Sequence, residues 1–162
     1  MSSKPELLYW DSCVFLSYID AEVDRVDVIE TLFAEVQKSK GAKKIVTSTV
    51  SIAEVAYGAQ EKKRAALDHS IRERIDALWN DKSVLTFIEF HDGIARIARE
   101  LMREAISKGH ALKPLDAIHL ASAQWLQVQE VHTYDDKLEK FAVAIGRKIC
   151  APYADQPRLP DL

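Results

Sequence analysis

The chain alternates short apolar runs with longer segments in which apolar residues recur every three or four positions. Apolar runs rich in β-branched and aromatic residues are typical of buried strands, whereas the second spacing is typical of amphipathic helices. The pattern predicts strands at 7–10, 44–47, 84–90, 131–133 and 148–150. It predicts helices at 24–38, 49–58, 60–79, 92–109, 114–127 and 135–142.

Residues that start or stop helices support these boundaries. Gly41 follows the first predicted helix, and Pro114 falls in the first turn of another, where proline is favoured. Strands that alternate with helices indicate an α/β fold with a central parallel sheet and helices on both faces. Three prolines after Cys150 predict an irregular tail at 151–162, which leaves 1–150 as a single domain.

Composition narrows the class of protein. The 162 residues are 48% apolar and carry a formal charge of −3, which argues against nucleic-acid binding through bulk positive charge. No apolar run approaches the ~18 residues of a membrane span, and the N-terminus does not resemble a signal peptide. Two cysteines form no disulfide framework, so we expect a cytoplasmic protein without a membrane partner.

Four acids fall at strand ends or early in the helices that follow them. Asp11 ends the first strand, Glu54 and Asp116 lie in later helices, and Asp135 follows the fourth strand. Because parallel strands end at one edge of a sheet, these carboxylates are expected to meet there. Clustered carboxylates repel one another unless cations neutralise them, and oxygen ligands favour one or two Mg²⁺ or Mn²⁺ ions. Such a site is suited to phosphodiester hydrolysis.

Four segments in order resemble the PIN-domain family over about residues 7–150. They are LLYWDSCVFLSYI, STVSIAEVAYG, LKPLDAIHLASAQW and VHTYDDKLEKFA. Each segment by itself is loosely defined, but the ordered set is specific. The resemblance implies a PIN-like three-layer sandwich with a central parallel sheet and helices on both faces. It also implies metal-dependent endoribonuclease activity on RNA, and many small members resemble VapC toxins of type II toxin–antitoxin pairs.

Carried over to this chain, the resemblance implies that Asp11, Glu54, Asp116 and Asp135 are catalytic metal ligands. It implies that Ser12 and Thr133 orient those carboxylates through hydrogen bonds. A VapC-like protein would also bind a cognate antitoxin and form a homodimer. The alternative is a PIN-fold module that binds RNA or protein with weak or no catalysis.

The chain departs from the family pattern at three neighbouring places. Cys13 stands where a polar residue is frequent, and a thiol is a weak hydrogen-bonding group, which favours the alternative of weak catalysis. Tyr134 stands where Asn or Arg is frequent and is a candidate for stacking on a base. Asp136 directly follows Asp135, which leaves the fourth ligand open by one position; Asp135 is preferred because it lies two residues after Thr133.

Other side chains have both a functional and a structural interpretation. His119 lies three residues after Asp116 on the same helix face, although packing in the core is the commoner role. Asp92 is expected to cap a helix, with a groove-lining role as the alternative. The basic cluster contacts RNA phosphates or forms a solvated helix face; its members are Lys62, Lys63 and Arg64.

Overall fold

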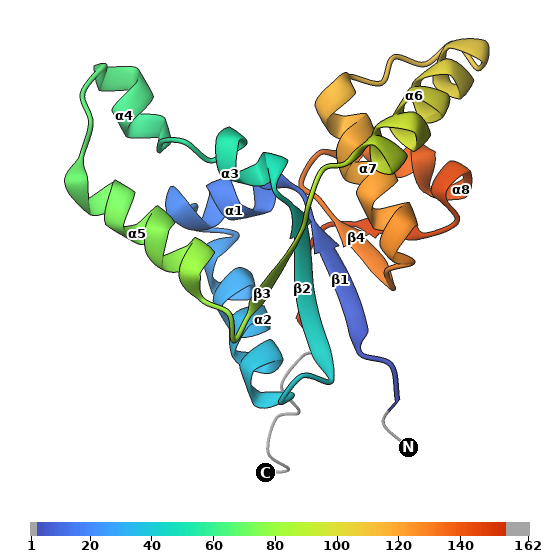
Figure 1. The fold of residues 1–162 in the computed structure, drawn as a ribbon. Helices are drawn as coiled ribbons and strands as arrows, with labels where there is room; N and C mark the ends of the chain where they lie inside the picture. Colours follow the sequence, from blue (N-terminus) through green and yellow to red (C-terminus); the bar gives the residue numbers. More distant parts are fainter. Residues whose placement is uncertain (1–2, 155–162) are drawn as a thin grey trace.

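The computed structural model describes residues 3–154, which form a five-stranded parallel sheet between two layers of helices (Figure 1). The strand order is β3-β2-β1-β4-β5, which places β1 at the centre. The strands are β1 (Glu6–Trp10), β2 (Lys43–Ser48), β3 (Leu85–Ile88), β4 (Glu130–His132) and β5 (Lys148–Cys150). All five predicted strands are confirmed, as is the three-layer α/β arrangement.

Helices cover both faces of the sheet. The helices are α1 (Ser12–Ile19), α2 (Val26–Lys38), α3 (Val50–Glu54), α4 (Ala59–Arg64), α5 (His69–Asn80), α6 (Asp92–Ser107), α7 (Pro114–Leu126), the 3-10 helix η1 (Asp136–Phe141) and α8 (Ala142–Ile145). Figure 1 shows α1, α2 and α5 on one side and α6, α7 and α8 on the other. The strand ends, the start of α1 and the start of α7 therefore share one edge.

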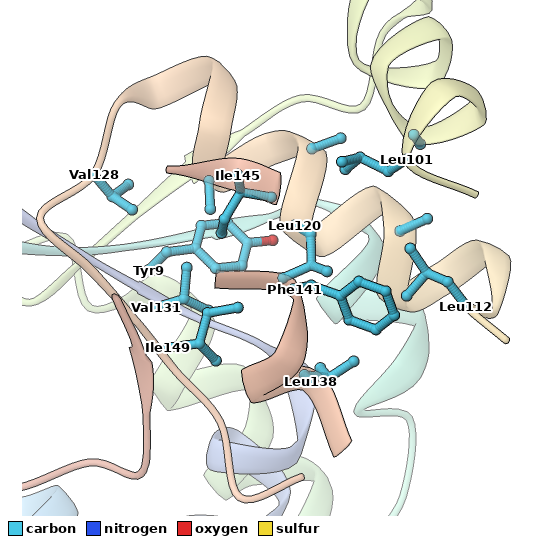
Figure 2. Close-up of a cluster of buried hydrophobic side chains, with 14 of the residues drawn as sticks. Tyr9, Leu101, Leu112, Leu120, Val128, Val131, Leu138, Phe141, Ile145 and Ile149 are labelled. Carbon is cyan, nitrogen blue, oxygen red and sulfur yellow. The ribbon is translucent and has the colours of Figure 1, made fainter. Parts of the chain in front are cut away.

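Successive side chains of β1 point to opposite faces of the sheet and pack into both halves of the core. Leu8 and Trp10 point into the layer formed with α1, α2 and α5. Tyr9 points to the opposite face, where its ring packs in the cluster that contains Leu120 and Val131 (Figure 2). From Leu8 to Trp10 both faces of the central strand are buried, as expected for a parallel sheet. Asp11 follows this rigid strand directly, so the core fixes the position of its backbone.

Two predicted helices are shorter than expected. The helix predicted over 60–79 is two helices, because Ala65 adopts a left-handed conformation (φ 50°) and Asp68 begins a new helix by accepting a hydrogen bond from the Ser70 N–H. The helix predicted over 49–58 ends at Glu54, and Val55 is already non-helical. Alanine favours helices, so residue composition alone gave no indication of the break at Ala65.

The boundaries after β3 and β4 also differ in detail. The cap of α6 is His91, whose Nδ1 accepts from the Ile94 N–H at 3.4 Å; the expectation that Asp92 caps this helix is wrong, because Asp92 lies in its first turn. The segment predicted as a helix over 135–142 is mostly the 3-10 helix η1. Residues 151–154 have no regular structure, and the rest of the expected tail lies outside the described residues. Among those described, no helix is long and apolar enough to cross a membrane.

Candidate active site

Asp11 lies at the junction of β1 and α1 with only 5% of its surface exposed. The Cys13 thiol donates a hydrogen bond to Asp11 Oδ1 at 2.8 Å. Burial raises the pKa of Asp11, while hydrogen bonds from Cys13 and Thr133 act in the opposite direction. A buried carboxylate that ionises at neutral pH in this position needs a compensating positive charge.

Cys13 and Thr133 connect Asp11 to the end of the neighbouring strand. Cys13 Sγ lies 3.3 Å from Thr133 Oγ1 and accepts a hydrogen bond from the Tyr134 N–H at 3.2 Å. Thr133 Oγ1 in turn accepts from the Asp135 N–H at 3.0 Å. Thr133 thus contacts the Cys13 thiol and the backbone of Asp135, and its hydrogen bond also acts on the pKa of Asp11. Ser12 differs: within the described residues its side chain makes no hydrogen bond to any of the four acids, and the thiol of Cys13 makes that contact because it faces the carboxylate.

Asp116 brings a second helix to this edge. It lies in the first turn of α7 and is about half-buried. Burial raises its pKa, and the charges of Asp11, Asp135 and Glu54 raise it further. The charge of Glu54 also raises the pKa of Asp11. Asp116 is therefore influenced by the charges of the other three candidate carboxylates, and Asp11 by that of Glu54.

The two consecutive aspartates after β4 have different surroundings. Asp135 is partly buried, its Oδ1 accepts from the Lys137 N–H at 3.0 Å, and its charge reaches Asp116. Asp136 is exposed in the first turn of η1. The surroundings of the two residues favour Asp135 as the fourth member of the group.

Glu54 is joined to the group through His119. Glu54 Oε1 lies 2.5 Å from His119 Nε2, and His119 Nδ1 lies 2.6 Å from the Tyr9 hydroxyl. His119 is buried, with 2% of its surface exposed. Its packed position agrees with the structural interpretation of this residue, and its contact with Glu54 also places it next to the acids.

Several predicted groove residues lie apart from the acids. The basic cluster (Lys62, Lys63 and Arg64) is exposed at the end of α4, and within the described part of the chain it makes no ion pair with the four acids. Asp92 has 89% of its side chain exposed, and its Oδ2 forms an ion pair with Arg96 Nε at 3.8 Å. Within residues 3–154, no ion pair links these residues to Asp11 or Asp116.

Tyr134 is already stacked in this structure. The Arg25 guanidinium lies 4.0 Å from the centre of its ring, a cation–π geometry, and the ring packs against the core cluster of Trp10. One face of the ring is therefore occupied. A base that stacks on Tyr134 must use the other face or displace Arg25.

A second group of possible metal ligands lies on the sheet face that carries Trp10. Ligand atoms of Glu130, His132 and Cys150 all lie within 4.8 Å of one another. However, the Trp10 indole N–H donates to His132 Nδ1 at 3.1 Å, so Nδ1 carries a lone pair and Nε2 carries the hydrogen that faces Glu130 Oε2 at 2.9 Å. A metal on Nε2 would require the hydrogen to lie on Nδ1 instead. That N–H would then face the Trp10 N–H, and two donors cannot hydrogen-bond to each other. This arrangement disfavours a metal there.

The four acids are better suited to bind a divalent cation than the group of Glu130, His132 and Cys150. Their donors are carboxylate oxygens, the ligands preferred by Mg²⁺ and Mn²⁺. Throughout residues 3–154, none of the four forms an ion pair with a lysine or arginine; the single ion-pair partner is His119, beside Glu54. Like charges gathered at a partly buried edge without a basic partner favour the uptake of a cation.

Comparison with known proteins agrees with this architecture. The PIN domain family model matches residues 8–144, so the chain belongs to the PIN domain family. A search of curated proteins finds no significant match. The family membership therefore rests on the match to residues 8–144, and similar solved structures bear on the fold.

Similar folds occur in toxin–antitoxin proteins. VapBC2 from Rickettsia felis, bound to a promoter DNA fragment, gives a TM-score of 0.68 at 15% identity over 91% of this chain and 99% of that one. The Mycobacterium tuberculosis toxin VapC20, which cleaves the sarcin–ricin loop, gives 0.60 at 16% identity over 85% and 94%. A Klebsiella pneumoniae toxin–antitoxin complex gives 0.59 at 21% identity over 91% and 99%.

Three contacts at the site were not predicted from the sequence. They involve Tyr9, Cys13 and Arg25, whose partners His119, Asp11 and Tyr134 are described above. The position of Tyr9 in an apolar strand gives a weak signal, because a buried tyrosine hydroxyl needs a partner. No sequence signal identifies that partner 110 positions away.

Proposed function

We propose that this chain is an endoribonuclease that depends on Mg²⁺ or Mn²⁺ and cleaves phosphodiester bonds at Asp11, Glu54, Asp116 and Asp135. The observation that carries the proposal is the gathering of four carboxylates, without a lysine or arginine partner, at the carboxyl edge of the sheet. The PIN family membership and the likeness to VapC structures support it. Metal bound by these oxygens would activate water and stabilise the leaving oxygen.

The residues of the chain prepare this site. Asp11 is fixed by the hydrogen bond from Cys13, and Asp135 is held by its own cap on η1. Asp116 lies in the first turn of α7, where the charges of Asp11 and Asp135 both raise its pKa. Glu54 accepts a hydrogen bond from His119 through one oxygen and keeps the other for a ligand. Carboxylates held in place bind a cation without a further loss of conformational entropy.

We further propose that the chain acts in the cytoplasm as the toxin of a type II toxin–antitoxin pair. Solved relatives of this fold include VapBC2 and a Klebsiella pneumoniae toxin–antitoxin complex. A short cognate antitoxin that covers the acidic edge would restrain the activity. A homodimer and an RNA substrate belong to the same proposal, as does a domain that spans 1–150.

Paired aspartate variants test the activity. Purified protein should cleave a structured RNA when Mn²⁺ is added and stop when a chelator is added. Asp135→Asn should lose activity by at least about tenfold, because the amide keeps the cap to Lys137 but loses the charge. The matched control Asp136→Asn alters an exposed neighbour and should cleave like the parent. Equal activity of all three proteins would contradict the proposal.

The alternative is a PIN-fold binding module with weak or no catalysis. It is favoured by Cys13, because a thiol is a weaker hydrogen-bonding group than the polar residue frequent at this position. The 2.8 Å hydrogen bond to Asp11 weakens that argument. Calorimetric titration with Mn²⁺ separates the two functions, since a nuclease must bind the ion at millimolar concentration or below. RNA binding without Mn²⁺ uptake would favour the binding module.

A further inference from the structure

A buried chain of hydrogen bonds joins three of the elements that carry the candidate ligands. It runs from Tyr9 in β1, through His119 in α7, to Glu54 at the end of α3. Asp11 lies two residues after Tyr9, and Asp116 lies three residues before His119. One continuous contact therefore connects the elements that supply Asp11, Asp116 and Glu54.

Glu54 is the ligand that most needs such support. Its side chain is the longest of the four, and it is the last residue of a helix only five residues long. The helix backbone leaves its regular path at Val55. A flexible glutamate on a short helix loses side-chain entropy when it is held in one rotamer, so an external contact is required to fix it. His119 provides that contact from the middle of α7, which has 13 residues.

The chemistry of Glu54 decides which atom carries the hydrogen in its contact with His119. The Glu54 carboxylate only accepts, so the hydrogen in the 2.5 Å contact is carried by His119 Nε2. His119 Nδ1 lies 2.6 Å from the Tyr9 hydroxyl, which is the second hydrogen bond of the imidazole. A tyrosine hydroxyl can donate and accept at the same time, so Tyr9 can bond both His119 and the Ser48 N–H.

The other end of the chain of contacts is equally fixed. The Tyr9 oxygen accepts a hydrogen bond from the Ser48 N–H at 3.2 Å, which ties it to the end of β2. The Tyr9 ring is fully buried in the core cluster shown in Figure 2. A hydroxyl held on both sides cannot swing away from His119. The orientation of the imidazole is therefore set by the core of the sheet.

We propose that Tyr9 and His119 are positioning residues that orient the Glu54 carboxylate for a divalent cation. The proposal rests on the proposed function, because it takes Glu54 as a ligand. His119 occupies Glu54 Oε1 and leaves Oε2 for the cation. Hydrogen-bonding partners of this kind typically change metal affinity by about 10–100-fold.

Calorimetric titration of the full chain with Mn²⁺ tests the proposal. Tyr9→Phe removes one oxygen and keeps the ring, and it should weaken Mn²⁺ binding by about tenfold. His119→Leu should weaken it by about 10–100-fold, whereas His119→Gln keeps an amide donor and should recover part of the loss. Tyr18→Phe is the matched control, because Tyr18 packs edge-on against Phe33 in the other core cluster; it should bind Mn²⁺ like the parent.

A thermal melt of each variant separates positioning from stability. A purely structural role would lower Tm and leave the dissociation constant of the folded protein unchanged, which would overturn the proposal. If Glu54→Ala weakens Mn²⁺ binding but Tyr9→Phe and His119→Leu do not, the positioning role fails and the metal site stands. If the parent itself binds no Mn²⁺, the proposed function and the positioning role both fail.

Discussion

Cys13 Sγ lies 2.8 Å from Asp11 Oδ1 and donates a hydrogen bond to it. Burial, together with the nearby Asp11 charge, raises the pKa of Cys13 to about 12. The thiol therefore keeps its proton near neutral pH and acts as a donor rather than as a nucleophile. A residue that looks like a departure from the family pattern thus supports the central acid.

Replacing this donor should affect both stability and metal binding. Cys13→Val keeps the approximate volume but removes the donor to Asp11 and the acceptor for the Tyr134 N–H. A buried N–H without a partner costs about 1–3 kcal/mol, so Tm should fall and Mn²⁺ should bind more weakly. Cys13→Ser keeps a hydroxyl in the same place and should behave like the parent. Indistinguishable melts and titrations for the two variants would show that the thiol has no such role.

The strands and the order of the acids could be predicted because both are local patterns. Apolar β-branched runs mark strands, and an acid directly after a strand falls at the carboxyl edge of a parallel sheet. Contacts between distant residues could not be predicted in this way. Tyr9 and His119 are 110 positions apart, and only the packing of α7 on β1 brings them together. Cys13 contacts Asp11 only two positions away, but its contacts with Thr133 and Tyr134 span 120 and 121 positions.

The break between α4 and α5 shows a second limit. Residues 60–79 are rich in helix formers, and local propensity favours one helix. The structure instead places Ala65 at φ 50° and ψ 40°, a conformation that costs an L-residue about 1–2 kcal/mol. Asp68 then accepts from Ser70 and starts α5 afresh. Local hydrogen bonds override propensity here, because Glu61 Oε2 accepts from the Asp68 N–H at 2.8 Å across the turn, a contact that the sequence pattern does not reveal.

Glycine at this break should stabilise the fold. Ala65→Gly relieves the left-handed strain, offset in part by the greater freedom of glycine in the unfolded chain, for a net gain of about 0.5–1 kcal/mol. A gain of that size raises Tm by about 1–4 °C in a protein of this length. Ala66→Gly is the matched control, because its φ is not positive, and it should lower Tm. A lower Tm for Ala65→Gly would contradict the assigned backbone conformation.

His132 should resist protonation on acidification. Burial lowers its pKa, although Glu130 acts in the opposite direction, and a proton on Nδ1 would abolish the hydrogen bond from Trp10. Because its folded pKa lies below the unfolded value, the unfolded state binds more protons, and this contribution to stability is lost as pH falls below about 6.5.

Nitrogen NMR checks this directly. It should show the Nε2–H tautomer of neutral His132 and a pKa below 6.5, and Glu130→Gln should lower that pKa further because it removes the opposing charge. Denaturation should require less urea at pH 5.5 than at pH 7.5. An Nδ1–H tautomer, or a pKa above the ordinary value, would refute the locked arrangement with Trp10.

Asp11 should lower the stability of the metal-free protein. Its pKa is raised by burial, so the folded state favours the neutral form, and ionisation above the ordinary value of 3.8 reduces stability as pH rises. In a chelator at neutral pH, Asp11→Asn should therefore raise Tm, because the amide keeps an acceptor for Cys13 without a buried charge. Added Mn²⁺ should reverse the order, raising the Tm of the parent but not that of the variant.

The exposed Asp136→Asn control should melt like the parent in both conditions. If Asp11→Asn lowered Tm in chelator, the carboxylate would be stabilising the fold by itself, and the argument that its burial is compensated by a cation would fail.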